Sequence, residues 1–253
     1  VVLGCGAIGS AISEILVRAG IQSIILVDYK VVIESSLDRH IYLRKNDLGK
    51  SKVQTLMTYL SRINSNLNVI GYEEKLIPST DLSQWIDSDA SLIINSCDEP
   101  YIGHTSLKVG RFAAERNIPF YVAGGFDAHL MSSGELIYPP LTPCIDCAQK
   151  TFTKSLEGWK PTYSNTADNN TLVTEYSEVN SIVSFNNYQI GGAGGLAMMS
   201  GFSANLSALK ILQFLTEDYN YNYKPFRYEY LPNTGELTQF EMLKQEHCNV
   251  CKS

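Results

Sequence analysis

A glycine-rich turn between two apolar runs constrains the fold of this chain more than any other feature. The opening segment VVLGCGAIGS places Gly4, Gly6 and Gly9 between a β-branched run and a helical pattern, and Asp28 ends a second apolar run, SIILVD. A strand, a tight glycine turn and a helix N-terminus together form a site for phosphate, and an acid at the tip of the next strand suits ribose hydroxyls. The pattern predicts a βαβ unit that binds a nucleotide. A glycine turn that only allows close packing is the alternative.

Strand-like and helix-like patterns alternate after this unit. Helical spacing of apolar residues predicts helices at 7–19, 50–64, 82–88 and 104–117, with a longer apolar helix from about 196. Strands are predicted at 1–5, 23–28, 67–76, 90–98, 118–127 and 132–140, and an antiparallel hairpin at 226–243. This order is typical of an α/β fold, Rossmann-like, in which a mostly parallel sheet carries helices on both faces.

Length and composition predict one domain over residues 1–253, because no repeat and no clean linker divides the chain. The chain starts inside a predicted strand without a methionine, so we expect an upstream N-terminal segment. Residues 151–190 are rich in Ser, Thr, Asn and Tyr and lack periodicity. We interpret them as a mobile loop over the active site, with a plain surface insertion as the alternative. Met198 and Met199 are expected to fill the core.

Charge and hydropathy argue against two classes of partner. The net charge of −6 and the isoelectric point near 5.3 disfavour a general nucleic-acid surface. No apolar run approaches the length of a membrane span, and no signal peptide is recognisable. We therefore expect a cytoplasmic protein that acts on neither nucleic acid nor membrane, with its thiols reduced.

Two CxxC pairs predict a metal site. PCIDC supplies Cys144 and Cys147, and HCNVC supplies Cys248 and Cys251, each pair on a predicted turn. Four thiolates suit a closed, tetrahedral Zn²⁺ site, which leaves no position for catalytic water. The pairs are about 100 residues apart, so the zinc would clip the C-terminal hairpin region onto the body of the domain. Free thiols or disulfides are the alternative.

Three further residues predict the kind of nucleotide. Arg39 and Lys52 follow Asp28, the residue predicted to bind the ribose. Two cations at this place favour a triphosphate over a nicotinamide ring. Asp98 ends a later strand, where ligands of open α/β sheets bind, and its carboxylate can hold the Mg²⁺ that bridges phosphates. Arg39 and Lys52 could instead be solvated charges, and Asp98 a helix N-cap.

In motif order, nearly the whole chain resembles the ubiquitin-activating-enzyme-like superfamily, which includes ThiF, MoeB, HesA and the microcin-maturing MccB type. The glycine loop, VDYKVVIESSLDRHIYL, DLGKSK, NSCD and the two CxxC pairs carry the resemblance. It implies a homodimer that uses ATP and Mg²⁺ to convert a carboxylate into an acyl-adenylate. The implied nucleotide and Mg²⁺ site comprises Gly4, Gly6, Gly9, Asp28, Arg39, Lys52 and Asp98, and the implied zinc ligands are Cys144, Cys147, Cys248 and Cys251.

The chain also departs from the family pattern. The family's DxD is Asp28-Tyr29-Lys30, Ser36 stands where the family has asparagine, and His40 stands where it has glutamine. Losing these amide groups is expected to weaken or alter phosphate handling. The run from Asp98 to Tyr101 matches the acid-x-Pro-aromatic pattern of the MccB type.

These patterns lead to one main hypothesis and three alternatives. The main one is an ATP-dependent adenylyltransferase that activates the C-terminal carboxylate of a peptide, in microcin-like peptide-antibiotic maturation. The first alternative is activation of a ubiquitin-like sulfur carrier. The others are a catalytically reduced scaffold that binds a leader peptide, and an NAD-dependent oxidoreductase. No cysteine lies in 151–190, so transfer of the acyl group to an enzyme thiol there is not expected.

Overall fold

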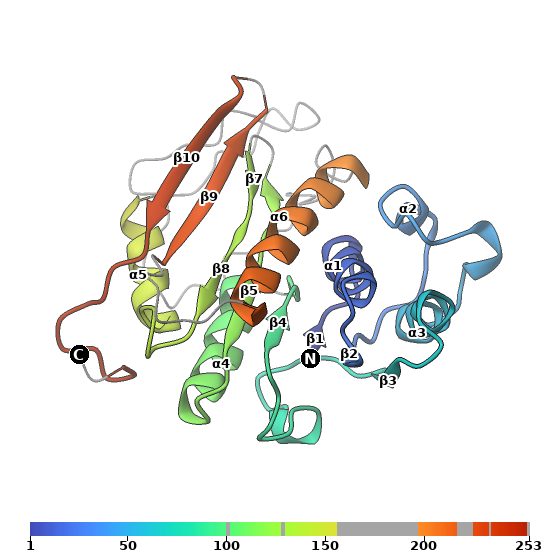
Figure 1. Ribbon diagram of the computed structural model, residues 1–253, viewed down its shortest axis with the longest axis horizontal. Helices are drawn as coiled ribbons and strands as arrows, with labels where there is room; N and C mark the ends of the chain where they lie inside the picture. Colours follow the sequence, from blue (N-terminus) through green and yellow to red (C-terminus); the bar gives the residue numbers. More distant parts are fainter. Residues whose placement is uncertain (100–101, 128–129, 156–196, 217–224, 233, 252–253) are drawn as a thin grey trace, which may run out of the picture.

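The computed structural model describes residues 1–99, 102–127, 130–155, 197–216, 225–232 and 234–251. Two sheets organise these residues (Figure 1). The larger is six-stranded, in the order β3-β2-β1-β4-β5-β8, and the smaller is four-stranded, in the order β10-β9-β7-β6. In the larger sheet the neighbours from β3 to β5 are parallel, and only β8 runs antiparallel, against β5. The smaller sheet is antiparallel throughout.

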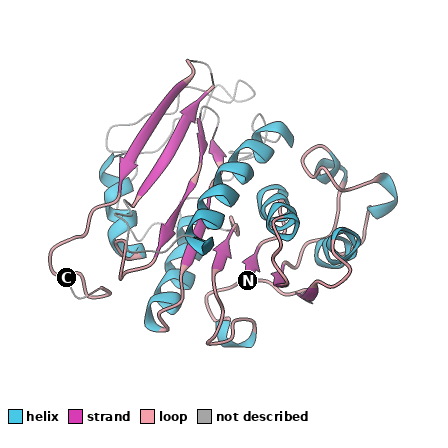
Figure 2. Ribbon diagram, viewed as in Figure 1, coloured by secondary structure: helices cyan, strands magenta, loops and turns pink. Residues whose placement is uncertain are grey.

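The strands of the larger sheet are β1 (Val2–Leu3), β2 (Ser23–Val27), β3 (Asn68–Tyr72), β4 (Ile93–Asn95), β5 (Phe120–Ala123) and β8 (Gly134–Ile137). Those of the smaller sheet are β6 (Phe126–Asp127), β7 (Leu130–Ser132), β9 (Phe226–Leu231) and β10 (Glu236–Glu241). The helices are α1 (Ala7–Arg18), α2 (Glu34–Leu37), α3 (Lys52–Ile63), α4 (Ile102–Glu115), α5 (Ile145–Ser155) and α6 (Ala197–Thr216). Short 3₁₀ turns occupy Lys45–Asp47 and Leu82–Gln84 (Figure 2).

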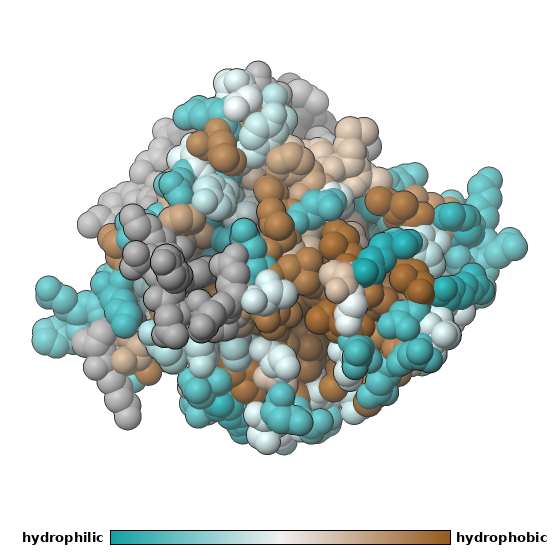
Figure 3. Space-filling model, in the orientation of Figure 1, coloured by the Kyte–Doolittle hydropathy of each residue, from teal (hydrophilic) through white to brown (hydrophobic). Residues whose placement is uncertain are grey.

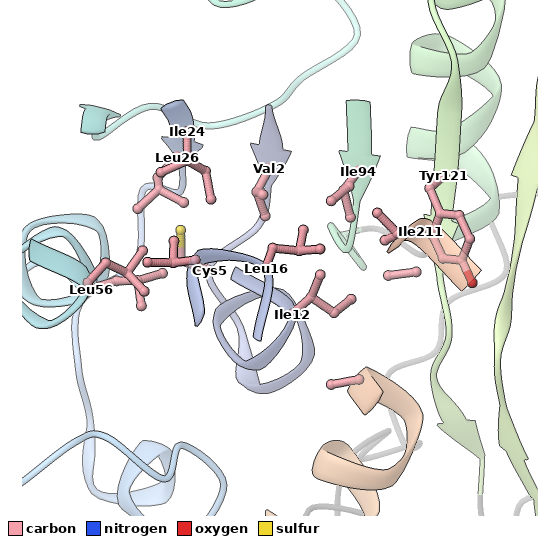
Figure 4. Close-up of a cluster of buried hydrophobic side chains, with 14 of the residues drawn as sticks. Val2, Cys5, Ile12, Leu16, Ile24, Leu26, Leu56, Ile94, Tyr121 and Ile211 are labelled. Carbon is pink, nitrogen blue, oxygen red and sulfur yellow. The ribbon is translucent and has the colours of Figure 1, made fainter. Parts of the chain in front are cut away.

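Helices cover both faces of the larger sheet, as the alternating pattern predicts. Val2 belongs to the core with α1, α3 and α6, whereas its neighbour Leu3 belongs to the core with α4 and α5. Leu26 and Val27 divide in the same way, because successive side chains of a strand point to opposite faces. Figure 4 shows the first core, with Val2 and residues of β2 and β4 facing Ile12 and Leu16 of α1.

The strand order creates a crevice at the carboxyl end of β1. The chain leaves β1 toward β2 and β3 on one side and later returns to β4 on the other side, so the connections diverge at that point. Ligands of open α/β sheets bind at such a reversal. The glycine turn between β1 and α1 lies there, which places the predicted nucleotide loop at the crevice.

Close packing of the turn requires two of its glycines. Gly4 has φ +92°, and a Cβ on it would lie 2.8 Å from the Ser96 hydroxyl. A Cβ on Gly9 would lie 2.1 Å from the Gly4 carbonyl oxygen and 2.4 Å from the same hydroxyl. The Ser96 hydroxyl donates to the Gly4 carbonyl at 2.7 Å, so β4 closes the turn from the other side. Gly6 differs, because a Cβ there would meet nothing within 4 Å.

Several predicted boundaries change in the structure. The strand predicted at 118–127 divides into β5 and β6, and the helix predicted at 82–88 is a three-residue 3₁₀ turn. Cys147 lies inside α5 rather than on a turn, and residues 151–155 continue that helix, so the predicted loop cannot begin at 151. The remainder of that predicted loop, to residue 190, lies outside the described residues.

The expectation that Met198 fills the core is wrong, since this side chain is 73% exposed. Helix α6 packs on α1 and the sheet through a narrow stripe of small residues that includes Ser203, Ala204, Ser207 and Ala208. The stripe lets the helix axes approach closely and turns the larger side chains of the first turns outward. Figure 3 shows apolar surface gathered over the centre of this face, across α1 and α6. None of the helices in the described ranges combines the length and apolar character needed to cross a bilayer.

We expect Gly9→Ala to lower the free energy of unfolding by about 2–3 kcal/mol, because the new methyl group would overlap a backbone carbonyl that cannot rotate away. Urea denaturation of the purified variant measures this loss. Gly201→Ala is the matched control: it is also a helical glycine, but open space surrounds its Cβ position. It should be neutral or stabilise by about 0.5–1 kcal/mol. Equal midpoints for the two variants would contradict the packing argument.

Candidate functional site

One pocket contains all of the residues predicted to bind the nucleotide. It lies at the carboxyl ends of β1, β2 and β4, and its lining includes Gly4, Gly6, Gly9, Asp28, Arg39, Lys52 and Asp98. These residues come from distant parts of the chain, so their convergence depends on the sheet topology. The structure places them together, while the role of each remains a prediction.

Asp28 fixes the shape of the pocket floor. One of its carboxylate oxygens accepts a hydrogen bond from the Cys5 N–H at 2.7 Å, and the other accepts one from the Lys30 N–H at 2.8 Å. The first bond ties the tip of β2 to the glycine turn, and the second orders the backbone that follows. Each oxygen keeps a further lone pair, so the carboxylate can still accept a hydrogen bond from a ligand hydroxyl.

Arg39 and Lys52 bring positive charge to the pocket. The Arg39 Nε–H donates to the Ser35 carbonyl at 3.2 Å, which anchors the side chain and leaves the outer guanidinium nitrogens for a ligand. Lys52 begins α3 and is only 6% exposed. Burial holds the pKa of Lys52 below its ordinary value, the neighbouring Lys30 and Arg39 act in the same direction, and Asp28 opposes them. An anionic ligand would relieve this crowding of cations.

Asp98 and Glu99 differ sharply in their surroundings. Asp98 is exposed and forms neither a hydrogen bond nor an ion pair with another residue of the described ranges. Glu99 binds Lys30, accepts a hydrogen bond from the Tyr29 hydroxyl and forms an ion pair with Lys75 at 3.2 Å. Burial raises the pKa of Glu99, but its bonds to Lys30, Tyr29 and Lys75 outweigh burial and bring that pKa to about 2. Glu99 is thus committed to holding cations, whereas Asp98 is available for a metal ion.

His40 is a buried wall of the same pocket. It is 3% exposed, and its Nδ1 lies 2.8 Å from the Ser36 carbonyl oxygen. Within the described part of the chain, Nε2 has no hydrogen-bond partner. Ser36, at the position where an asparagine was expected, is fully buried, and its hydroxyl accepts a hydrogen bond from the Ile33 N–H at 3.1 Å. The altered motif therefore stabilises the turn at α2 and places a histidine in the pocket wall.

Sequence reasoning overlooked several pocket residues, and only some carried a signal. Lys30 was visible as a departure from the family motif, but its ion pair with Glu99 joins segments far apart in sequence. The others are Glu74 and Lys75, after β3, and Ser200 on α6. Ser200 is 1% exposed, and its hydroxyl has no hydrogen-bond partner among the residues that the structure describes. No local pattern marks these residues, because the fold alone brings their segments to the crevice.

The four paired cysteines form a second site, remote in sequence from the glycine loop. Their sulfur atoms all lie within 4.8 Å of one another, and none is in a disulfide. Cys144 Sγ lies 3.5 Å from Cys248 Sγ, and Cys147 Sγ lies 3.7 Å from Cys251 Sγ. A tetrahedral ion with Zn–S bonds of about 2.3 Å needs sulfur separations of roughly 3.8 Å. The cluster therefore fits a closed metal site, and its donor set favours zinc.

Cys5 and Cys97 lie near the pocket but are poor nucleophiles. Cys5 is fully buried, and burial raises the pKa of its thiol well above the ordinary value. Burial likewise raises the pKa of Cys97 to about 12, with Asp28 and Asp98 adding to the effect. Both thiols remain protonated near neutral pH, so neither is suited to act as a nucleophile.

The ThiF family model matches residues 1–252. The chain belongs to the ThiF family. The sulfur carrier protein ThiS adenylyltransferase of Bacillus subtilis is 30% identical over 149 residues, which cover 58% of this chain and 42% of that protein. The adenylyltransferase and sulfurtransferase MOCS3 of Bos taurus is 36% identical over 81 residues, 32% of this chain and 18% of that protein. This ThiF-family chain thus spans less than half the length of these relatives.

Solved structures share the fold of this ThiF-family chain. Escherichia coli MccB with ATP aligns over 99% of this chain and 65% of that one, with a TM-score of 0.73 at 22% identity. MccB with AMPCPP and MccA aligns with a TM-score of 0.74 at 21% identity, over 99% of this chain and 65% of that one. At this identity the match establishes the architecture, including the mostly parallel sheet and the separate antiparallel sheet.

We expect the purified chain to carry one zinc ion, held by the four paired cysteines. Cys248→Ser should abolish zinc binding and lower the free energy of unfolding by more than about 3 kcal/mol, because the C-terminal tail loses its attachment. Elemental analysis and urea denaturation measure the two effects. Cys97→Ser is the control and should retain the metal. Full zinc content in Cys248→Ser would contradict the assignment.

Proposed function

We propose that this chain binds ATP with Mg²⁺ and adenylates the C-terminal carboxylate of a peptide or small protein. The observation that supports it most is the convergence of the glycine loop, Asp28, two cations and an exposed carboxylate in one pocket. Membership of the ThiF family, whose relatives include named adenylyltransferases, supports the same reaction. The two cations Arg39 and Lys52 beside the glycine loop favour a triphosphate over the nicotinamide cofactor that the NAD-dependent alternative would require.

The reaction joins a carboxylate to AMP. A carboxylate oxygen of the substrate attacks the α-phosphorus of ATP, a new O–P bond forms, and the bond between the α-phosphorus and the bridging oxygen breaks. Pyrophosphate leaves with the electron pair, and the acyl-adenylate is a mixed anhydride that an amine or sulfur nucleophile can attack. A carboxylate alone is inert to amines at neutral pH, which is why activation is needed.

Residues of the pocket can supply the binding and charge stabilisation that this reaction needs. The N-terminus of α1, behind Gly6, and the guanidinium of Arg39 suit phosphate oxygens, and Lys52 adds a point charge. Asp98 would hold the Mg²⁺ that neutralises charge on the phosphates. Asp28 would accept hydrogen bonds from the ribose. These groups position the reactants and stabilise charge that develops on the phosphate.

Two substrate classes follow from the comparisons. MccB, which shares the fold, was solved with MccA, and the acid-x-Pro-aromatic run beginning at Asp98 favours a peptide substrate of that kind. The sequence relatives are named for the sulfur carrier ThiS and for sulfurtransferase activity, and they favour a small carrier protein. We place the peptide first, as in microcin-like maturation, and the sulfur carrier second. A catalytically reduced scaffold that binds a leader peptide is the remaining alternative.

We further propose a homodimer in the cytoplasm with a structural zinc ion in each subunit. Exposed apolar side chains on α6, among them Met198, Phe202 and Leu209, support a dimer because a contiguous apolar face is costly to leave in water. The donor set of the cysteine cluster supports zinc.

Exchange of labelled pyrophosphate into ATP tests the proposed reaction. With a panel of C-terminal peptides and Mg²⁺, we expect exchange that requires a free C-terminal carboxylate and disappears with the peptide amide. Asp98→Asn should reduce exchange by a factor of about 100–1,000, because the neutral amide is a poorer Mg²⁺ ligand.

The matched control is Asp87→Asn, which removes an exposed carboxylate outside the pocket and should leave exchange unchanged. Retained exchange in Asp98→Asn would remove that residue from the site. Tight binding of a peptide without exchange, for every peptide and carrier tried, would favour the scaffold and overturn the proposed enzyme.

A further inference from the structure

In the wall of the predicted nucleotide pocket, His40 has a ring nitrogen, Nε2, that has no hydrogen-bond partner among the described residues. The residue is 3% exposed, and it lines the pocket with Arg39 and Lys52. Buried polar atoms are nearly always hydrogen-bonded, so the unpartnered Nε2 requires a physical explanation. A ligand group that binds beside Arg39 and Lys52 is one, because His40 lines the same pocket.

The hydrogen bond on the other side of the ring fixes its tautomer. Nδ1 lies 2.8 Å from the Ser36 carbonyl oxygen, and a carbonyl can only accept, so Nδ1 carries the proton. In the neutral ring Nε2 then carries a lone pair and no proton. That lone pair would repel an anionic phosphate oxygen, whereas a protonated Nε2 would donate to it in a charge-assisted hydrogen bond.

The surroundings of His40 keep it neutral while the pocket holds no ligand. Burial lowers the pKa of His40 to about 4, and the positive charges of Lys52 on α3 and Arg39 after α2 act in the same direction. The backbone of Ser36 and of Cys5 opposes them, because it accepts hydrogen bonds from the charged ring. Tyr42 lies edge-on, with its ring centroid 6.1 Å away. Burial raises the pKa of the Tyr42 hydroxyl and of the Cys5 thiol, so neither contributes charge near neutral pH.

We propose that His40 binds a phosphate group of the nucleotide as an imidazolium, so that each nucleotide entering the pocket brings one proton from solvent onto Nε2. This inference rests on the proposed nucleotide-binding function and identifies a further binding residue for it. Phosphate charge neutralises Arg39 and Lys52, which removes the repulsion that opposes protonation and adds an acceptor for the new N–H. The family's glutamine at this position could donate the same hydrogen bond without taking up a proton.

Proton linkage gives the sign of the pH dependence. Between the pKa of His40 in the free protein, about 4, and its higher value in the complex, binding consumes a proton. Affinity therefore increases as the pH falls through that window and decreases as the pH rises. For one proton the change approaches tenfold per pH unit.

The experiment compares wild type with His40→Gln. Isothermal titration calorimetry with a non-hydrolysable ATP analogue and Mg²⁺, at pH 6, 7 and 8 in buffers of different ionisation enthalpy, counts the protons bound. The analogue titrates identically with both proteins, so its contribution cancels in the difference. We expect wild type to take up about one proton more than His40→Gln where His40 is fully protonated in the complex, and to lose affinity relative to it as the pH rises. His104→Gln, which alters an exposed histidine on α4, should behave as wild type.

The outcomes separate failure of this inference from failure of the proposed function. Equal proton uptake and equal pH dependence in wild type and His40→Gln would show that His40 stays neutral, as it would if Nε2 accepted a bond from a ribose hydroxyl. The nucleotide-binding proposal would then survive and this inference would not. Failure of wild type to bind the analogue at all would overturn the proposed function and this inference with it.

A second measurement on the wild-type protein covers the case in which His40→Gln does not fold. Imidazole resonances of the histidines, followed by NMR at pH 7, report the charge of each ring. Addition of the analogue should shift one resonance to the position of a charged ring, and that resonance should be absent from any folded His40 variant. No change of charge at any histidine would contradict the inference.

Discussion

The packing of the structure depends on one contact, at Gly9, that leaves no room for a side chain. The carbonyl of Gly4 and the hydroxyl of Ser96 occupy the space where a Cβ on Gly9 would lie, so β1, α1 and β4 meet with only backbone and one small side chain between them. This close approach directs the N-terminus of α1 into the crevice where the strand order reverses. The same constraint therefore determines the packing of the sheet and the position of the predicted phosphate site.

Charge in the pocket is arranged around this backbone scaffold in two ways. Lys30 and Lys75 at the mouth are paired with Glu99, so their charges are satisfied by the protein itself. Lys52 and Arg39 form no such ion pair with another described residue, and Lys52 is buried with a lowered pKa. A buried cation without a close partner destabilises the free protein, and a polyanion that binds there recovers that free energy. In the same way, a ligand that forms a hydrogen bond with Nε2 of His40 would satisfy a buried polar atom that the described residues leave without a partner.

The features that could be predicted from the sequence are those that a local pattern of residues encodes. The glycine loop, Asp28 and the paired cysteines could be picked out because each belongs to a recognisable motif, and the structure brings the members of each site together. Helices α1 and α3 begin and end within two residues of the prediction because their apolar periodicity is strong. The bonds of Glu99 to Lys30 and Lys75, and the place of Ser200 in the pocket, were missed. Segments far apart in the sequence meet there only because the fold brings them together. Met198 was misplaced because hydropathy does not reveal that a helix packs through its small residues.

The cysteine cluster and the nucleotide pocket are joined by the packing of two helices. Cys144 and Cys147 bracket the start of α5, and Ile145 between them packs on Gly110 of α4, where an added Cβ would lie 2.7 Å away. Arg111 of α4 and Asp146 of α5 form an ion pair across the same contact. Helix α4 begins at Ile102, shortly after Asp98 on the chain. A metal that fixes the start of α5 therefore also restrains α4, which follows the proposed Mg²⁺ ligand in the chain. A structural ion without an open coordination position can in this way influence the proposed reaction.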